Sequence, residues 1–283
     1  MNNITIIGIG LIGGSFALDL RSLYPKAHLV GIDNNPEHVA EAVRLGIVDA
    51  EGTMEALHLA DLVVLTVPVD IATQLLPEVL DQIGDDTIVL DMGSTKEAIC
   101  ESVVAHPNRR NFIACHLIAG TEFSGPSAAI KGLYKGKTNI ICEVEKTTFK
   151  LQEKALDIFK RLDMRIRYMD PASHDKHIAY MSHLSHISSF MLGKTVIDKE
   201  KNERDIFDMA GSGFASTVRL AKSSPTTWTS IFKQNKTNIL ETLEEYISNL
   251  EGFKTLMESD DFEGVFKEME NTNHIKEILK GID

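Results

Sequence analysis

Residues 8–14 read Gly8-Ile9-Gly10-Leu11-Ile12-Gly13-Gly14, and this stretch decides the fold because it fits the pattern G-x-G-x-x-G. An apolar, strand-like run (residues 4–8) precedes it, and a helix-compatible stretch (residues 11–23) follows at once. In this setting the backbone N–H groups of the turn approach a pyrophosphate, while the helix N-terminus contributes partial positive charge. We therefore expect the turn to bind a dinucleotide through Gly8, Gly10, Leu11, Ile12 and Gly13.

An acidic residue stands where such a turn needs one. Asp33 comes twenty residues after Gly13, at the end of the second strand-like run. Its carboxylate can accept hydrogen bonds from both ribose hydroxyls of NAD and would repel the 2′-phosphate of NADP. Asn34 and Asn35 follow, with no arginine at that point to bind such a phosphate. These residues predict NAD as the cofactor. The alternative is a turn that only eases strand–helix packing, with Asp33 capping the next helix.

The first part of the chain alternates short apolar runs with helical periodicity. The near-continuous run at residues 61–65 is typical of a strand buried on both faces, as in a parallel sheet. This alternation predicts an α/β fold, a Rossmann-type doubly wound sheet over residues 1–170. The expected strands are 4–8, 28–32, 62–67, 87–91, 111–116, 138–142 and 164–168, and the expected helices are 11–23, 37–45, 71–82, 96–104 and 147–162.

The pattern changes after Asp170-Pro171, where strand-like alternation stops. The rest predicts an all-α domain over residues 171–283, and we expect it to bind substrate and to form dimers. No internal repeat or low-complexity tract is present in the sequence. The expected helices are 173–194, 205–209, 217–222, 226–250 (open to an interruption) and 260–279.

Composition restricts the class of protein. The 283 residues carry 29 basic and 41 acidic side chains, a formal charge of −12, which disfavours binding to nucleic acid. The longest apolar run, residues 62–69, is too short to cross a bilayer, and the first residues show no secretory signal. Three cysteines form no CxxC pair, and Cys115 and Cys142 fall in strand-like runs that predict buried, reduced thiols. We expect a cytoplasmic protein that binds neither nucleic acid nor membrane.

Ligands of open α/β sheets bind outside the carboxyl ends of the strands. That edge is expected to present the glycine turn, Asp33, Ser94 and His116, together with the segment 66–69. Val67 and Pro68 in this segment would wall the cofactor, although the same residues also suit a plain turn.

A hydroxyl and an imidazole near a nicotinamide suggest oxidation of an alcohol. In that reaction His116 would remove the hydroxyl proton while hydride leaves the same carbon, and the ordinary pKa of histidine lies close to neutral pH. Two alternatives stay open on sequence alone. The first is that His116 is a structural histidine whose hydrogen bonds are satisfied within the fold. The second is that Ser94 is the N-cap of the helix that begins near Lys96.

The helical part holds four histidines in one stretch, His174, His177, His183 and His186. His183 and His186 share a helix face, but no further ligand pattern accompanies them, so we expect no metal. Solvent exposure is the simplest expectation for these side chains, and a hydrogen bond to substrate is the functional one. Arg219 is a candidate clamp for a carboxylate, with surface ion pairing as the alternative.

Together these segments resemble the prephenate/arogenate dehydrogenase family of tyrosine biosynthesis, most closely its monofunctional bacterial prephenate dehydrogenases, over almost the whole chain. Several motifs in the right order make the resemblance more specific than the glycine turn alone. The stretches that carry it are 8–18, 31–36, 91–96, 116–125, 182–186, 211–221 and 224–228.

The resemblance implies NAD-dependent oxidative decarboxylation of prephenate to 4-hydroxyphenylpyruvate and CO2, in a homodimer with its active site between the two domains. It implies that His116 is the catalytic histidine that hydrogen-bonds the ring hydroxyl and that Ser94 orients it. It also implies that His183 binds substrate, that Arg219 grips a substrate carboxylate, and that Thr121 and Glu122 lie near the mouth of the site.

Three departures from the family pattern concern the same segments. Leu117 and Ser185 stand where the family commonly has proline, and Ala215-Ser216 stand where it often has Arg-Asp. The last removes two charges near the expected substrate site, which leaves arogenate open as a substrate. Another alternative is a β-hydroxyacid, for which Lys176 or Lys194 would supply the lysine that such dehydrogenases use. A third alternative is that the protein is an NAD-binding sensor without turnover.

Overall fold

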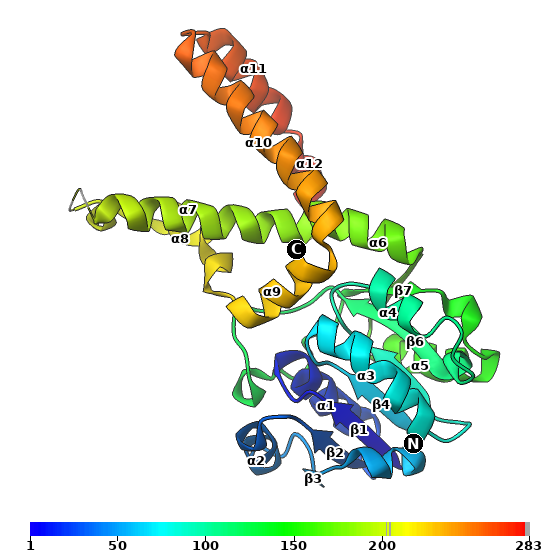
Figure 1. Ribbon diagram of the computed structural model, residues 1–283. Helices are drawn as coiled ribbons and strands as arrows, with labels where there is room; N and C mark the ends of the chain where they lie inside the picture. The colour runs from blue at the N-terminus through cyan, green and yellow to red at the C-terminus, as the bar shows by residue number, and fades with distance from the viewer. Residues whose placement is uncertain (202, 204, 281–283) are drawn as a thin grey trace. The chain divides into compact units, whose positions relative to one another are not determined.

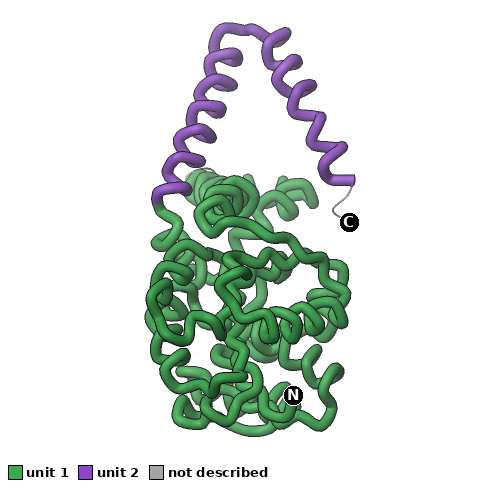
Figure 2. Tube along the Cα trace, turned by 90° about the vertical axis from the view of Figure 1, so that its right-hand side faces the viewer, with its two compact units in different colours: residues 1–236 green, residues 237–283 purple. Residues whose placement is uncertain are grey.

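The computed structural model describes residues 1–201, 203 and 205–280. The chain divides into two compact units, residues 1–236 and residues 237–283, which are coloured separately in Figure 2. The first unit contains the sheet and every residue of the candidate site. The second unit is purely helical in its described part.

An eight-stranded sheet forms the centre of the first unit, with the order β3-β2-β1-β4-β5-β6-β7-β8 among the described residues. The order reverses between β1 and β4, as in a doubly wound fold. The first six strands are parallel, so their carboxyl ends meet at one edge of the sheet. The strands are β1 (Asn3–Ile7), β2 (His28–Ile32), β3 (Ala50–Glu51), β4 (Leu62–Leu65), β5 (Ile88–Asp91), β6 (Phe112–Leu117), β7 (Thr138–Cys142) and β8 (Arg165–Met169).

Helices cover both faces of the sheet (Figure 1). One buried cluster joins the sheet to α1 (Leu11–Leu23), α2 (Pro36–Arg44) and α5 (Phe149–Arg161). The other joins the opposite face to α3 (Val69–Gln82) and α4 (Glu97–Ser102). The apolar runs of the central strands are buried on both sides, which confirms the predicted Rossmann-type α/β fold.

The strand β7 differs from the expected parallel arrangement. It runs antiparallel to β6, pairing Cys115 with Ile141 and His116 with Ile140. The connection between these strands, residues 118–137, contains only one short 3-10 turn, so no crossover helix returns the chain to the other end of the sheet. The two-residue strand β3 was also not expected, because so short a run carries no periodicity.

Helices make up the described chain after β8, as predicted. A continuous path runs through α6 (Pro171–Ile178), a π-helical turn (Ala179–His183) and α7 (Leu184–Glu200). The remaining helices of the first unit are α8 (Ser212–Thr217), a 3-10 turn (Arg219–Lys222) and α9 (Pro225–Gln234), and those beyond it are α10 (Lys236–Glu258), α11 (Phe262–Thr272) and α12 (Ile275–Leu279). Asn235 interrupts the expected 226–250 helix.

Polar contacts attach α9 to α3 and to the segment just before α4. The Gln234 amide donates to the Val69 carbonyl oxygen at 2.9 Å and to Thr73 Oγ1 at 2.8 Å, and its Oε1 accepts from Thr95 Oγ1 at 2.8 Å. Ser230 Oγ donates to Asp70 Oδ1 at 2.5 Å. These bonds fix α9, which carries Trp228, against the helix that follows β4.

Cys100, Cys115 and Cys142 are all buried and unpaired, as the strand-like surroundings of two of them predicted. Within the described residues, no helix is both long enough and apolar enough to pass through a membrane.

Candidate active site

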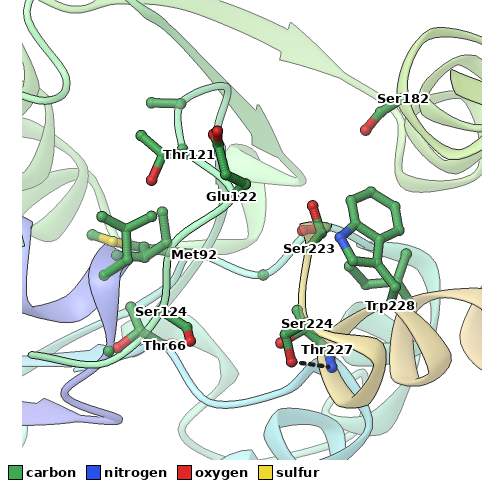
Figure 3. Close-up of a pocket in the computed structure, with 18 of the residues that line it drawn as sticks. Thr66, Met92, Thr121, Glu122, Ser124, Ser182, Ser223, Ser224, Thr227 and Trp228 are labelled. Carbon is green, nitrogen blue, oxygen red and sulfur yellow. Dashed lines mark hydrogen bonds between the residues drawn. The ribbon is translucent and has the colours of Figure 1, made fainter. Parts of the chain in front are cut away.

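A cavity of about 530 Å³ lies along the carboxyl edge of the sheet and is closed on its other side by helical residues. Figure 3 shows Trp228 and Ser223 across this cavity from Thr121 and Met92. Ser94, His116, Thr121, Glu122 and Arg219, all expected site residues, line it together. So do the expected cofactor residues Gly10, Leu11, Ile12, Val67 and Pro68.

The glycine turn is shaped partly by packing and partly by open space. Gly8 has φ +92°, and a Cβ there would lie 2.8 Å from the Thr66 carbonyl carbon. A Cβ on Gly13 would collide with the Gly8 carbonyl oxygen. Gly10 is different, because a Cβ there would meet no atom within 4 Å. The protein itself does not need glycine at position 10, so the empty space fits a molecule that approaches this backbone closely.

The first turn of α1 also suits an anion. Its N-cap residue is Gly10, which has no side chain to satisfy the first helical N–H groups, and the turn contains no acidic residue. Unsatisfied N–H groups and the helix dipole favour a phosphate at this position. Thr66 borders the same space, and its hydroxyl donates to the Gly8 carbonyl oxygen at 2.6 Å.

Asp33 lies beside the glycine turn and does not cap a helix. Its Oδ2 accepts from the Ile9 N–H at 2.9 Å, and its Oδ1 accepts from the Asn35 N–H at 2.9 Å. The side chain of Asn35, not Asp33, caps α2 by accepting from Glu37 N–H. Each carboxylate oxygen keeps acceptor capacity beyond these bonds.

A buried ion pair holds the segment that carries Ser94. Lys96 and Asp91 are nearly inaccessible, and the Lys96 ammonium donates to Asp91 Oδ2. Burial acts to lower the pKa of Lys96, but the Asp91 carboxylate outweighs it and raises that pKa. Asp91 Oδ1 also accepts from Gly93 N–H at 2.9 Å, which fixes the turn before Ser94.

Ser94 lines the cavity but does not cap α4. Asp175 does so, because its two carboxylate oxygens accept from Lys96 N–H at 2.7 Å and Glu97 N–H at 3.0 Å. The Ser94 hydroxyl is therefore not occupied by the capping role that the sequence left open.

His116 sits in β6 with 9% of its surface exposed and lines the cavity. Its Nδ1 lies 2.8 Å from Nε2 of His174. Burial, and after it the neighbouring His174, Lys96 and His183, hold the pKa of His116 well below the ordinary histidine value. The ring is therefore neutral at physiological pH, which a general base requires.

The helical histidines depart from the expected solvent exposure. His174, His183 and His186 are buried and only His177 is exposed, because the π-helical turn and the helices around it pack their rings inward. His183 does not line the cavity. Its Nδ1 faces the Asn235 amide at 3.2 Å, its Nε2 is buried without a partner, and burial lowers its pKa to about 4.

His186, three residues on, does line the cavity and stacks on Trp228 with ring centroids 3.4 Å apart. Its Nδ1 lies 2.9 Å from the Ser182 carbonyl oxygen. No group of histidine, cysteine and carboxylate side chains in the described chain is arranged to hold a metal.

At the mouth of the cavity, Arg219 Nη1 lies 3.1 Å from Glu122 Oε2. Thr121, the neighbour of Glu122, accepts from Phe123 N–H at 3.3 Å through its hydroxyl. Arg219 thus makes an ion pair, the alternative left open by the sequence, and this pair lies at the cavity. The sequence did not predict that Trp228, His186 and Ser182 line the cavity. For His186 a signal was present, because it shares a helix face with His183.

A Rossmann-type sheet with a glycine cradle, an acidic residue beside it, and a neutral histidine in the same cavity defines the class of dinucleotide-dependent dehydrogenases with a helical second part. Two family models match the chain. One, described as prephenate dehydrogenase, nucleotide-binding domain, matches residues 16–168, and the other, prephenate dehydrogenase, dimerization domain, matches residues 170–271. The chain belongs to the prephenate dehydrogenase family.

Individual relatives agree with this assignment. The chain is 29% identical to the prephenate dehydrogenase of Bacillus subtilis, over 94% of this chain and 73% of the relative. It resembles a crystal structure of Aquifex aeolicus prephenate dehydrogenase in complex with hydroxyphenyl propionate and NAD+, with a TM-score of 0.88 and 32% identity, covering 100% of this chain and 99% of the other. It also resembles Synechocystis arogenate dehydrogenase, with a TM-score of 0.73 and 26% identity, covering 97% and 99%.

Proposed function

We propose that this protein is an NAD-dependent prephenate dehydrogenase, which converts prephenate to 4-hydroxyphenylpyruvate and CO2 in tyrosine biosynthesis. One observation carries the proposal: a single cavity holds the neutral His116, the cradle at Gly10 and the cationic Arg219. This combination supplies a base, a place for a dinucleotide and a partner for a carboxylate.

The cofactor site fits NAD. Gly10, Leu11 and Ile12 would hold the pyrophosphate, Asp33 would accept the ribose hydroxyls, and Val67 and Pro68 would form a wall. Bound NAD supplies a hydride acceptor. The Asp33 carboxylate disfavours the extra phosphate of NADP, and no arginine follows it directly in the sequence.

The side chains then divide the work on prephenate. His116 accepts the proton of the ring hydroxyl while Ser94 orients the reacting groups, and Arg219 grips a carboxylate. Loss of CO2 produces an aromatic ring, which drives the reaction, so the protein mainly has to position substrate and accept one proton. We further propose that His186, Thr121 and Glu122 contact substrate from the cavity wall. The part assigned to His183 by resemblance falls to His186, which faces the cavity.

The residues that line the cavity also bear on the choice between prephenate, arogenate and a β-hydroxyacid as substrate. Arogenate carries an ammonium group where prephenate has a keto group, and an ammonium group needs an anionic partner. Among the lining residues, all in the described chain, Glu122 alone has a carboxylate, and Arg219 already engages it. No lysine belongs to the lining, and Lys194 instead pairs with Asp198 on an exposed helix face. Both observations favour prephenate over arogenate and over a β-hydroxyacid.

The test is a comparison of purified protein with prephenate, arogenate and a β-hydroxyacid, each with NAD and with NADP. We expect NADH and 4-hydroxyphenylpyruvate in equal amounts from prephenate, with the other pairs slower. A higher kcat/KM for arogenate would replace the substrate assignment. NAD binding without turnover of any of these substrates would support the alternative that the protein is a non-catalytic NAD-binding sensor.

We also propose a homodimer formed through the helical part, in agreement with the dimerization-domain model that matches residues 170–271. Large apolar side chains are exposed on its helices, among them Met191, Ile197, Phe262, Phe266 and Met269. A cytoplasmic location is proposed as well, supported by three buried cysteines that remain unpaired.

A further inference from the structure

The base in the cavity is the end of a buried chain of hydrogen bonds. His174 Nε2 lies 2.8 Å from His116 Nδ1, and His174 Nδ1 lies 2.7 Å from Asp175 Oδ1. Because Nδ1 of His116 is taken by His174, only Nε2 remains to meet a molecule in the cavity that His116 lines. The state of that nitrogen therefore depends on the residues behind the ring.

The direction of this chain follows from Asp175. Both of its carboxylate oxygens accept backbone N–H bonds, Oδ1 from Lys96 at 2.7 Å and Oδ2 from Glu97 at 3.0 Å. A carboxylate has no proton to donate, so it must also accept in its hydrogen bond with His174. The proton of that bond therefore sits on Nδ1 of His174. For a neutral His174 ring the other nitrogen, Nε2, is then an acceptor. With that ring, His116 carries its own proton on Nδ1 and keeps a lone pair on Nε2.

Burial makes this arrangement hard to reverse. His174 is 1% exposed and Asp175 is 2% exposed, so water cannot replace either partner of the chain. The helix α4 reinforces it, because the same carboxylate caps the start of that helix. The low pKa of His116 keeps its ring neutral, which is the state in which the choice between the two tautomers matters.

We propose that Asp175, acting through His174, fixes His116 in the tautomer whose Nε2 lone pair faces the cavity. The inference rests on the proposed function of His116 as the base. When the substrate hydroxyl gives its proton to Nε2, the O–H electron pair stays on oxygen and an N–H bond forms on the ring. The resulting imidazolium already donates through Nδ1 to His174, so no group has to turn. His174 and Asp175 are thus positioning residues.

The experiment combines kinetics with 15N NMR of histidine-labelled protein, using His174→Leu, His174→Gln and a control, His177→Leu. His177 lies on the same helix, α6, but is exposed and does not line the cavity. In the wild type we expect the His116 resonances of an imidazole protonated at Nδ1 and bare at Nε2. His174→Leu should raise the share of the opposite tautomer and lower kcat for prephenate roughly 10- to 100-fold, the scale known for hydrogen-bond partners of metal-bound histidines. KM for NAD should change less than threefold. His174→Gln should recover part of kcat, since an amide oxygen can accept from Nδ1, and His177→Leu should match the wild type.

Two results would overturn the proposal: a wild-type His116 protonated at Nε2, or a folded His174→Leu variant with unchanged kcat and tautomer. If His174→Leu does not fold, the wild-type spectrum and His174→Gln decide the question. The NMR measurement needs no substrate, so a protein that fails to oxidise prephenate would refute the proposed function while leaving the tautomer assignment to be judged by its own spectrum.

Discussion

Arg219 and Glu122, which are 97 residues apart in the sequence, form an ion pair of 3.1 Å at the mouth of the cavity. The 3-10 turn after α8 supplies the guanidinium, and the loop after β6 supplies the carboxylate. In the proposed function, Glu122 helps to hold the arginine where a substrate carboxylate would meet it. The pair is only partly shielded from water, so exchanging one carboxylate partner for another costs little.

Arg219→Ala should therefore weaken substrate binding more than it slows chemistry. We expect KM for prephenate to rise about 10- to 100-fold, the range for losing a hydrogen bond to a charged group, with kcat lowered less than fivefold. Initial rates at saturating NAD measure this. Lys222→Ala, a nearby basic residue outside the cavity lining, is the matched control. A KM that stays at the wild-type value would remove Arg219 from the binding site.

The glycine turn offers a paired prediction. Gly10→Ala places a methyl group in open space, so the free energy of unfolding should change by less than about 1 kcal/mol while Kd for NAD rises at least about tenfold. Gly13→Ala pushes a methyl group into the Gly8 carbonyl oxygen and should destabilise the fold by roughly 1–3 kcal/mol or more. Chemical denaturation and NAD titration separate the two effects. Unimpaired NAD binding by Gly10→Ala would contradict the cradle.

Cofactor choice should depend on Asp33. Asp33→Asn keeps an oxygen to accept from Ile9 N–H but loses the negative charge. We expect KM for NAD to rise about tenfold, because about one charge-assisted hydrogen bond is lost. The preference for NAD over NADP should shrink by a similar factor. Glu37→Gln, an exposed neighbour, serves as the control for charge alone. Equal preference ratios in Asp33→Asn and the wild type would show that Asp33 does not select the cofactor.

Acid should destabilise the protein through His183. Its folded-state pKa is about 4 because burial disfavours the charged ring, whereas an unfolded histidine titrates near 6.5. Between these values the unfolded chain binds a proton that the native ring does not, so the free energy of unfolding falls as pH falls. The contribution is complete above about pH 6.5 and amounts to about 3 kcal/mol lost by pH 4.

Urea denaturation from pH 7 to pH 4, at one protein concentration, measures this loss. His183→Gln, which can still accept from the Asn235 amide, should flatten the pH dependence, and His177→Gln should leave it unchanged because that ring is exposed. Parallel curves for all three proteins would mean that other groups cause the acid sensitivity.

Much of the fold follows from sequence, and so does the cavity position of several candidate cofactor residues, because local patterns encode both. The buried apolar runs predict the strands, and the rule that ligands bind at carboxyl ends brings Ser94 and His116 to one edge before any coordinates are known. The direction of a strand within the sheet is harder to predict from sequence. The antiparallel β7 depends on the absence of a crossover helix in residues 118–137, a segment whose turns carry no periodic signal.

The parts that sequence could not supply depend on long-range packing. His174 reaches His116 across 58 residues, and nothing local marks either residue as a partner of the other. His183 and His186 share a helix face by spacing, yet only His186 lines the cavity. The π-helical turn at Ala179–His183 ends at the first of these rings and changes the rotation per residue there, so an ordinary helical period cannot tell which ring faces the cavity.

The central claim is that His116 is the base of an NAD-dependent oxidation of prephenate, and turnover by His116→Asn tests it most directly. NADH formation with saturating prephenate and NAD should be rapid in the wild type and about 10²- to 10⁴-fold slower in the variant, whose NAD affinity and folding are unchanged. A folded His116→Asn protein that produces NADH at the wild-type rate would contradict the account.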